Sequence, residues 1–350
     1  MIRTLCQLVL TLWLATGAVT AQESVSQISA TSGQGGPKLT IRSTTDYDVM
    51  RPALAAFAAE HPTLSMAYEQ WGSNALYDLS LADCASGQPA ADVILSSAVH
   101  QMVDLVNRAC GSAYRSDLTE GLPAARVWRD ELWGITNEAA VIIYNTALVP
   151  AGDVPRTRFA LLDLMRQQGQ TYRGRIATYD IEESGLGYLF AFVDSLEAST
   201  FGALLEGFAR TDAVATCCSA EIIRGVAEGR YLIAYNVLGS YVDARALRDI
   251  GVIRPEDYTL FLSRAYMIPR DADQPEWAAA LLDFLLSPAG QDILAESQLV
   301  DRQGSEDTGL PDSARRDIAI EPTLLVAGDQ HRRVRFIGQW RSAFGQIATD

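Results

Sequence analysis

Short apolar or β-branched runs alternate with helical patterns along the chain, and this alternation restricts the fold more than any other feature. The run at 39–43 is followed by a helical pattern at 50–60 with apolar residues on one face. A run at 64–68 and a helical pattern at about 74–84 lead to 91–95, where nearly every residue is apolar. Alternation of this kind predicts an α/β fold, in which the last run is typical of a central strand of a parallel sheet.

The alternation begins again in the middle of the chain, which predicts a second lobe. The apolar, extended segment 133–144 ends in a stretch rich in proline and glycine, as expected for a crossing between lobes. The elements predicted beyond it are helices at 158–167, 187–196 and 220–228 and strands at 175–179 and 231–235. A long strand at 258–268 is expected to return to the first lobe. We therefore predict lobe 1 at 39–147 plus 266–350 and lobe 2 at 148–265, each a mostly parallel sheet flanked by helices, with the crossing strands as a hinge.

The last third of the chain predicts helices. Apolar residues recur at spacings of four up to 286 and indicate one buried stripe. Ser287 followed by Pro288 is typical of an N-cap and a first helical position, so a second helix is expected there. In 332–344, three aromatic residues lie four apart, which predicts a helix that docks by its aromatic edge.

The N-terminus predicts export. One positive charge at Arg3 precedes an almost entirely apolar run at 5–15 and a small-residue stretch ending at Ala21, which is the pattern of a signal peptide. The apolar run is roughly half of the ~20 residues that span a bilayer, so we expect cleavage after Ala21. Cys6 lies inside the apolar run and not at the cleavage site, where a lipoprotein would need it. The polar stretch 22–38 is expected to be a disordered leader before a soluble periplasmic protein.

Charge and cysteine content restrict the partners. The net charge of −15 argues against a nucleic-acid partner and against an anionic membrane surface. In an exported protein Cys84 and Cys110 are expected to pair within one lobe, which leaves Cys217 and Cys218 as a strained adjacent pair or as free thiols. A metal site is the competing interpretation, but the 3 histidines are scattered along the chain, so we expect no metal and no cofactor.

Polar loops follow four of the predicted strands, at the edge of an α/β sheet where ligands bind. Helix N-termini at this edge present unpaired backbone N–H groups and a partial positive charge. The candidate ligand-binding residues in these loops are Thr44, Thr45, Asp46, Ser96, Ser97, Asp180, Ser184, Gly185, Tyr235 and Asn236. Each loop alone is explained as well by helix capping. Together, converging from two lobes, they predict a site that holds a small polar or anionic ligand by neutral hydrogen bonds.

Arg264 is the remaining candidate, because it lies in an otherwise apolar stretch and needs a partner. An internal carboxylate such as Asp46 is one such partner, and a phosphate or carboxylate of the ligand is the other. Catalytic motifs are poor: the sequence lacks a Gly-x-Ser-x-Gly elbow, a His-Glu-x-x-His pair and a phosphate-binding P-loop. The adjacent Glu182 and Glu183 are typical of a solvated loop, so we expect no enzymatic activity.

Several motifs taken together resemble the type 2 periplasmic binding proteins of ABC importers, from 39 to about 344. These motifs are STTD at 43–46, ADVI and SSA within 91–98, TYD and SGLGY within 178–188, YNVLGSY at 235–241 and LSPAGQ at 286–291. The sequence stands nearest to the branch that contains ferric-ion-binding proteins and the phosphoglycerate transport regulatory protein. The resemblance implies two α/β lobes joined by crossing strands, with a ligand cleft between them that closes by hinge motion.

The resemblance also implies a function. Ferric-binding members usually place two consecutive tyrosines near 235–236, and Asn236 departs from that pattern. We therefore expect a monomeric periplasmic protein that captures a small anionic ligand, phosphorylated or carboxylated, for an ABC permease. The alternatives are a ligand-sensing accessory protein of a membrane sensor kinase and a ferric-ion-binding protein.

Overall fold

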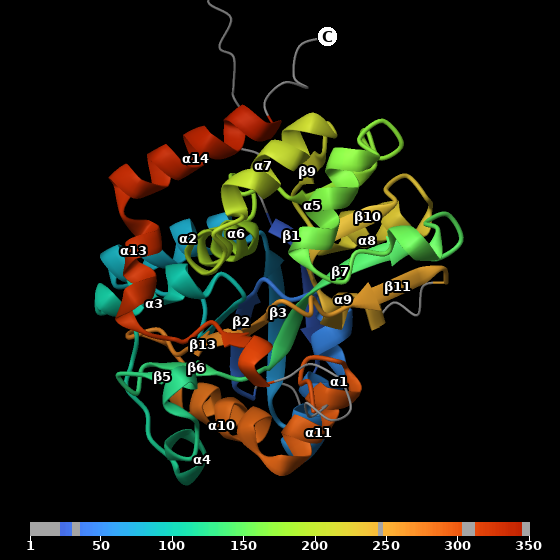
Figure 1. The fold of residues 1–350 in the computed structure, drawn as a ribbon. Helices are drawn as coiled ribbons and strands as arrows, with labels where there is room; N and C mark the ends of the chain where they lie inside the picture. Colours follow the sequence, from blue (N-terminus) through green and yellow to red (C-terminus); the bar gives the residue numbers. More distant parts are fainter. Residues whose placement is uncertain (1–21, 30–35, 244–247, 303–311, 345–350) are drawn as a thin grey trace, which may run out of the picture.

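Two sheets flanked by helices make up the molecule, which confirms the predicted α/β class (Figure 1). The computed structural model describes residues 22–29, 36–243, 248–302 and 312–344. The expected signal peptide and its cleavage site lie outside these residues. Within the described ranges no single helix is long and apolar enough to span a membrane, and only the pair Pro275–Leu286 and Pro288–Glu296, bent by 69°, passes that test when joined.

The first sheet has the strand order β1-β3-β2-β4-β13-β6-β5. Its strands are β1 Gln22–Ile28, β2 Lys38–Ser43, β3 Ser65–Trp71, β4 Val93–Ser96, β5 Val127–Trp128, β6 Leu132–Gly134 and β13 Ala265–Met267. The helices around it are α1 Tyr47–Glu60, α2 Ser73–Ser86, α3 Val99–Asn107, α4 Asp117–Glu120, α10 Pro275–Leu286 and α11 Pro288–Glu296. β2 pairs in parallel with both β3 and β4, so the predicted β-α-β-α-β unit is confirmed.

The second sheet has the order β14-β12-β7-β10-β8-β9, with β11 also paired to β7. Its strands are β7 Glu138–Asn145, β8 Ile176–Tyr179, β9 Val214–Thr216, β10 Ile233–Leu238, β11 Ile250–Ile253, β12 Thr259–Leu262 and β14 Arg315–Asp317. The associated helices are α5 Arg158–Gln167, α6 Gly185–Glu197, α7 Phe201–Arg210, α8 Ser219–Ala227, α9 Gly239–Asp243 and α14 Gln330–Phe344. The short helix α13 Leu325–Gly328 contacts α3 and α14. Short 3₁₀ turns are Ala124–Arg126, Ala151–Asp153, Asp312–Ala314 and Pro322–Leu324.

The stretch Gln22–Ile28 differs from the expectation of a disordered leader. It forms strand β1, which pairs antiparallel with β3 at the edge of the first sheet. Its side chains are mostly exposed, so the strand has no apolar periodicity that the sequence could reveal. Backbone hydrogen bonds to an edge strand need no particular side chains, and this is the reason that composition missed it.

The chain crosses between the sheets three times, after β6, after β12 and between β13 and β14, and the crossing points differ from the prediction. The predicted strand at 258–268 is two strands, β12 in the second sheet and β13 in the first, so it does return to the first sheet. β7 and β14 belong to the second sheet, although both segments were predicted in lobe 1. Sheet membership is set by long-range pairing, such as that of β7 with β10, which local periodicity cannot show.

The C-terminal helix α14 docks by its aromatic edge, as predicted. It lies beside α7 in Figure 1. Phe336 stacks on Phe201 with ring centroids 5.7 Å apart, and Phe344 meets Phe208 at 5.6 Å. The side chain of Trp340 is buried in the same cluster. The predicted N-cap is confirmed as well, because the Ser287 hydroxyl accepts the backbone N–H of Gly290.

Two disulfides are present among the described residues. Cys84 at the end of α2 is bonded to Cys110 beyond α3, with a sequence separation of 26, as expected. Cys217 and Cys218 are bonded to each other, so the open choice between a pair and free thiols is resolved as a pair.

The two disulfides should differ in their effect on stability, because the entropy that a disulfide removes from the unfolded chain grows with the logarithm of the loop that it closes. For the Cys84→Ser/Cys110→Ser variant, urea denaturation should show the free energy of unfolding reduced by about 3 kcal/mol. The Cys217–Cys218 disulfide closes almost no loop, so the Cys217→Ser/Cys218→Ser variant should have a nearly unchanged free energy of unfolding. Equal losses in the two variants would contradict this account.

Candidate functional site

A cleft of about 490 Å³ opens where residues from the two sheets and their helices face one another. It lies beyond the carboxyl ends of β2, β4 and β8, the edge at which α/β proteins bind ligands. Its lining consists of Glu23, Thr44, Asp46, Gln70, Trp71, Gly72, Ser73, Ser97, Tyr179, Glu183, Ser184, Leu186, Cys217, Cys218, Ser219, Ala220 and Tyr241. Seven of these 17 residues carry a hydroxyl group.

Four helices begin at the cleft. Gly72 is the N-cap of α2, Ser184 that of α6 and Cys218 that of α8, and Ser97 stands one residue before the N-cap of α3. The first-turn N–H groups of a helix have no acceptor within that helix. They also carry the positive end of the helix dipole. These helix ends bring partial positive charge to the lining, and in α6 the N–H groups of Gly185 and Gly187 already donate to the hydroxyls of Ser73 and Ser184.

Hydroxyl groups on both sides of the cleft are held in place by hydrogen bonds. The Thr44 Oγ1 lies 3.2 Å from the Ser97 Oγ and also accepts the Ser97 backbone N–H at 3.0 Å. On the other side the Tyr179 hydroxyl lies 2.6 Å from the Ser219 Oγ. These contacts fix the directions in which the hydroxyls face a guest.

The charged residues of the lining are all acidic. Glu23, Asp46 and Glu183 line the cleft, and none of the lining residues in the described part of the chain is Lys, Arg or His. The Gln70 side-chain amide donates to the carboxylates of both Glu23 and Asp46. These carboxylates can accept hydrogen bonds from a ligand, and the hydroxyls and helix ends of the lining can donate them.

Hydrogen bonds join the two halves of the molecule at the edge of the cleft. The Ser73 Oγ accepts the backbone N–H of Gly185 at 2.8 Å, and the Asn74 amide donates to the Glu182 carbonyl at 2.8 Å. A Cβ at Gly185 would lie 3.0 Å from the Cβ of Ala98, so glycine allows the start of α6 to approach the start of α3 this closely. The structure thus shows the two halves in contact on this side.

The sequence-predicted residues fall into two groups. Thr44, Asp46, Ser97 and Ser184 line the cleft, and the Gly185 amide lies at its edge.

The remaining candidates face elsewhere. Thr45 is fully buried, and the Ser96 hydroxyl accepts the backbone N–H of Ala98. Asp180 accepts the backbone N–H of Glu182 within its own loop.

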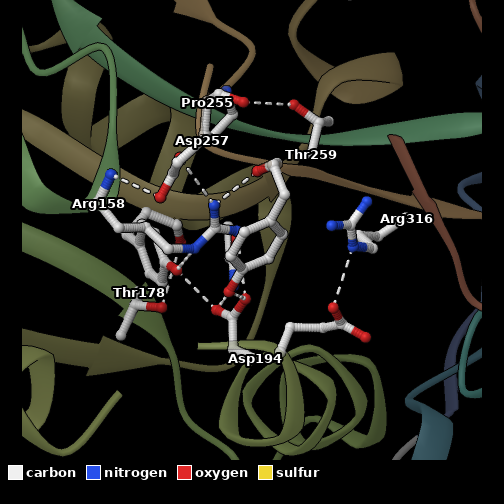
Figure 2. Close-up of polar contacts among 11 residues, drawn as sticks. Arg158, Thr178, Asp194, Pro255, Asp257, Thr259 and Arg316 are labelled. Carbon is white, nitrogen blue, oxygen red and sulfur yellow. Dashed lines mark hydrogen bonds and ion pairs between the residues drawn. The ribbon is translucent and has the colours of Figure 1, made fainter. Parts of the chain in front are cut away.

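Tyr235 and Asn236 belong to a buried network behind the cleft, and not to its lining. Both donate to the Asp194 carboxylate at 2.6 Å, which also accepts a hydrogen bond from the Tyr258 hydroxyl at 2.7 Å. Figure 2 shows the Arg158 guanidinium in the middle of this cluster, between Asp194 and Asp257. Asn236 has a φ of 57°, and this left-handed backbone turns its side chain inward.

Arg264 is likewise internal, and its partner is a protein carboxylate. The partner is Glu138 and not Asp46: Nε lies 2.8 Å from Oε1 of Glu138, and both side chains are fully buried. The guanidinium also donates to the Thr45 Oγ1 at 2.9 Å. Burial alone would lower the pKa of Arg264, but the charge of Glu138 raises it above its ordinary value, so the guanidinium stays charged.

Several lining residues were missed by sequence reasoning. Ser73 and Trp71 flank the start of α2, and Ser219 begins α8 after a strand of only three residues. A strand this short leaves no recognisable pattern, so nothing in the sequence showed that Ser219 follows a strand end. The Gly72-Ser73 pair before a helical pattern was the one available signal, because glycine and serine are common at helix starts.

Comparisons with known proteins agree with this geometry. The family model of bacterial extracellular solute-binding proteins matches residues 39–297. The substrate-binding protein of an ABC transporter from Agrobacterium tumefaciens has a TM-score of 0.87 and 28% identity, covering 93% of this chain and 100% of that chain. No curated protein matches the sequence significantly.

Two more distant structures share the fold. The apo ferric ion-binding protein A of Pasteurella haemolytica has a TM-score of 0.68 and 17% identity, with 89% of this chain and 99% of that chain covered. The periplasmic binding protein AfuA of Actinobacillus pleuropneumoniae, with fructose-6-phosphate bound, has a TM-score of 0.66 and 16% identity over 89% and 100%. The type 2 periplasmic binding fold is therefore confirmed.

The Arg264–Glu138 pair should matter for stability, because removal of one partner leaves a buried charge without its counter-ion. For Arg264→Met, chemical denaturation should show a loss of about 3–5 kcal/mol in the free energy of unfolding. The double variant Arg264→Met/Glu138→Gln should recover much of this loss. An Arg264→Met protein of unchanged stability would instead revive a direct role for Arg264 with ligand.

Proposed function

Because the chain belongs to the family of bacterial extracellular solute-binding proteins, we propose that it captures a small organic anion in the cleft and delivers it to an ABC importer. We assign each sheet and its helices to one lobe, with the hinge at two of the three crossings, 135–137 and 263–264. Closure of the lobes would bury the ligand, and the closed form is the one presented to the permease. Export to the periplasm with cleavage after Ala21 is part of the same proposal.

The convergence of helix N-termini is the observation that carries the preference for an anion. α2 and α3 from one side and α6 and α8 from the other all begin at the cleft. Phosphate and carboxylate groups bind well at such ends, because several N–H donors and the helix dipoles act on one negative charge. An arginine in the lining is not required for this mode of binding.

The acidic side chains of the lining favour a ligand that also carries hydroxyl groups. Asp46 and Glu183 can accept hydrogen bonds from such hydroxyls, whereas they would repel a second anionic group. A phosphorylated or carboxylated polyol therefore fits better than a compact dianion. The relative AfuA, whose structure contains fructose-6-phosphate, shares the fold and supports this choice.

A ferric ion fits the cleft less well. Within the residues that the structure describes, no group of three or more His, Cys, Asp or Glu side chains is placed to hold a metal ion. Burial raises the pKa values of Tyr179 and Tyr241, which opposes the phenolate form that a ferric ion requires. The likeness to ferric-binding proteins, at 17% identity, is a likeness of fold.

A thermal-shift screen tests the ligand class directly. A ligand present at 100 times its dissociation constant stabilises the folded state by ~2.7 kcal/mol, so the melting temperature should rise clearly. We expect a rise with a sugar phosphate or a hydroxycarboxylate and none with ferric ion. A shift produced by ferric ion alone would show that the ligand class is wrong.

Adjacent threonines provide a matched test of the cleft. Thr44→Ala removes a hydroxyl that lines the cleft and should weaken ligand binding by about tenfold, since a hydrogen bond to a charged group contributes roughly 1.5–3 kcal/mol. Thr45→Ala removes the hydroxyl that accepts from Arg264 and should lower stability instead. Calorimetric titration and urea denaturation measure the two effects. Loss of affinity in Thr45→Ala but not in Thr44→Ala would exclude this site.

A further inference from the structure

The adjacent cysteines Cys217 and Cys218 form a disulfide, and both residues line the cleft. We propose that this disulfide is a part of the ligand site that sets its affinity, so that reduction of the bond weakens binding. The inference rests on the proposed function, because it concerns the same cleft and the same anionic ligand.

The disulfide occupies a position where a helix is normally capped. Cys218 is the N-cap of α8, and its side chain accepts no capping hydrogen bond. In α5, α6 and α11 a threonine or serine hydroxyl accepts an N–H of the first turn. The first-turn N–H groups of α8 lack this acceptor, and the first two residues of the helix, Ser219 and Ala220, line the cleft.

The neighbours of α8 leave these donors open to a guest. Glu221, three residues after the N-cap, could close a capping box, but its carboxylate accepts from the Thr216 hydroxyl at 2.6 Å. The Ser219 hydroxyl is held by Tyr179. Neighbouring residues therefore hold the start of α8 in place, and the side chains of Cys218 and Glu221 do not cap its first-turn N–H groups.

The bond also restricts the backbone that leads into the helix. A disulfide between neighbouring residues closes a ring that includes the peptide group joining them, so the dihedral angles of both residues are coupled. The direction of the N–H groups of Ser219 and Ala220 follows from the backbone at Cys218. An intact bond thus preorganises the donors, and preorganised donors bind with less loss of conformational entropy.

Reduction changes both features. A dithiol reductant breaks the S–S bond, supplies two electrons and two protons to give the thiols of Cys217 and Cys218, and is itself oxidised to a disulfide. A helix N-terminus favours the thiolate form of a cysteine beside it. A thiolate at position 218 would accept the open N–H groups of α8 and would repel an anionic ligand, so both effects lower affinity.

Calorimetric titration of the full-length exported protein tests the proposal. The probes are sodium phosphate, fructose 6-phosphate, citrate and ferric citrate, each applied to the oxidised wild type and to Cys217→Ser/Cys218→Ser. Serine at 218 can cap α8 with its own hydroxyl, so we expect this variant to bind every probe that the wild type binds about tenfold more weakly or worse. Circular dichroism and the unfolding midpoint confirm that the variant is folded.

The remote disulfide supplies the matched control. Cys84→Ser/Cys110→Ser should keep the wild-type affinity, and treatment of this variant with dithiothreitol then acts on the Cys217–Cys218 bond alone among the described disulfides. Reduction should weaken binding about tenfold, and reoxidation should restore it. Affinities within twofold of the wild type in both Cys217→Ser/Cys218→Ser and the reduced control would overturn the proposal. A wild type that binds none of the probes would overturn the proposed function itself.

Discussion

The buried pair of Arg264 and Glu138 lies where two of the three crossings pass between the sheets, and it supports residues that line the cleft. Glu138 begins β7 directly after one crossing, and Arg264 stands in the other. The same guanidinium donates to the Thr45 Oγ1 and lies 5.2 Å from the ring centroid of Tyr241. A buried charge is tolerated only when its partners are in place. Through these contacts the ion pair holds the loop that contains Thr44 and the side of the cleft that Tyr241 lines.

A second buried arginine organises the other half of the molecule in the same way. Arg158 at the start of α5 reaches Asp194 on α6, and Tyr235 on β10 donates to that carboxylate. The network ties two helices to the sheet just behind the cleft. It joins α6 to β10, and in the proposed lobe motion this connection would keep the direction of the α6 N-terminus. Tyr235 and Asn236, which the sequence suggested as ligand-binding residues, therefore support the elements behind the cleft.

The sequence was most informative about elements whose signals are local. The helix Arg158–Gln167 was predicted with its observed bounds, and Ser287 with Pro288 marked a helix start, because periodicity and capping depend on near neighbours. Side-chain direction in loops was not predictable. Thr44 and Thr45 are identical in type and adjacent, yet one faces the cleft and the other is buried against Arg264. That difference depends on a contact 219 residues away, which no local pattern contains.

Helix ends from both halves of the molecule reach the cleft, and the proposed release of the ligand would use this division. An arginine–phosphate pair in a closed, desolvated cleft is strong and opens slowly, because both charges must be rehydrated. A neutral hydrogen bond from a helix end is weaker than an arginine–phosphate pair. The helix ends that reach the cleft are divided between the two halves of the molecule. In the proposed hinge opening, the donors of one half would separate from those of the other, so affinity would depend on closure. The net charge of −15 adds to this effect, because an anion that leaves the cleft is repelled from the surface around it.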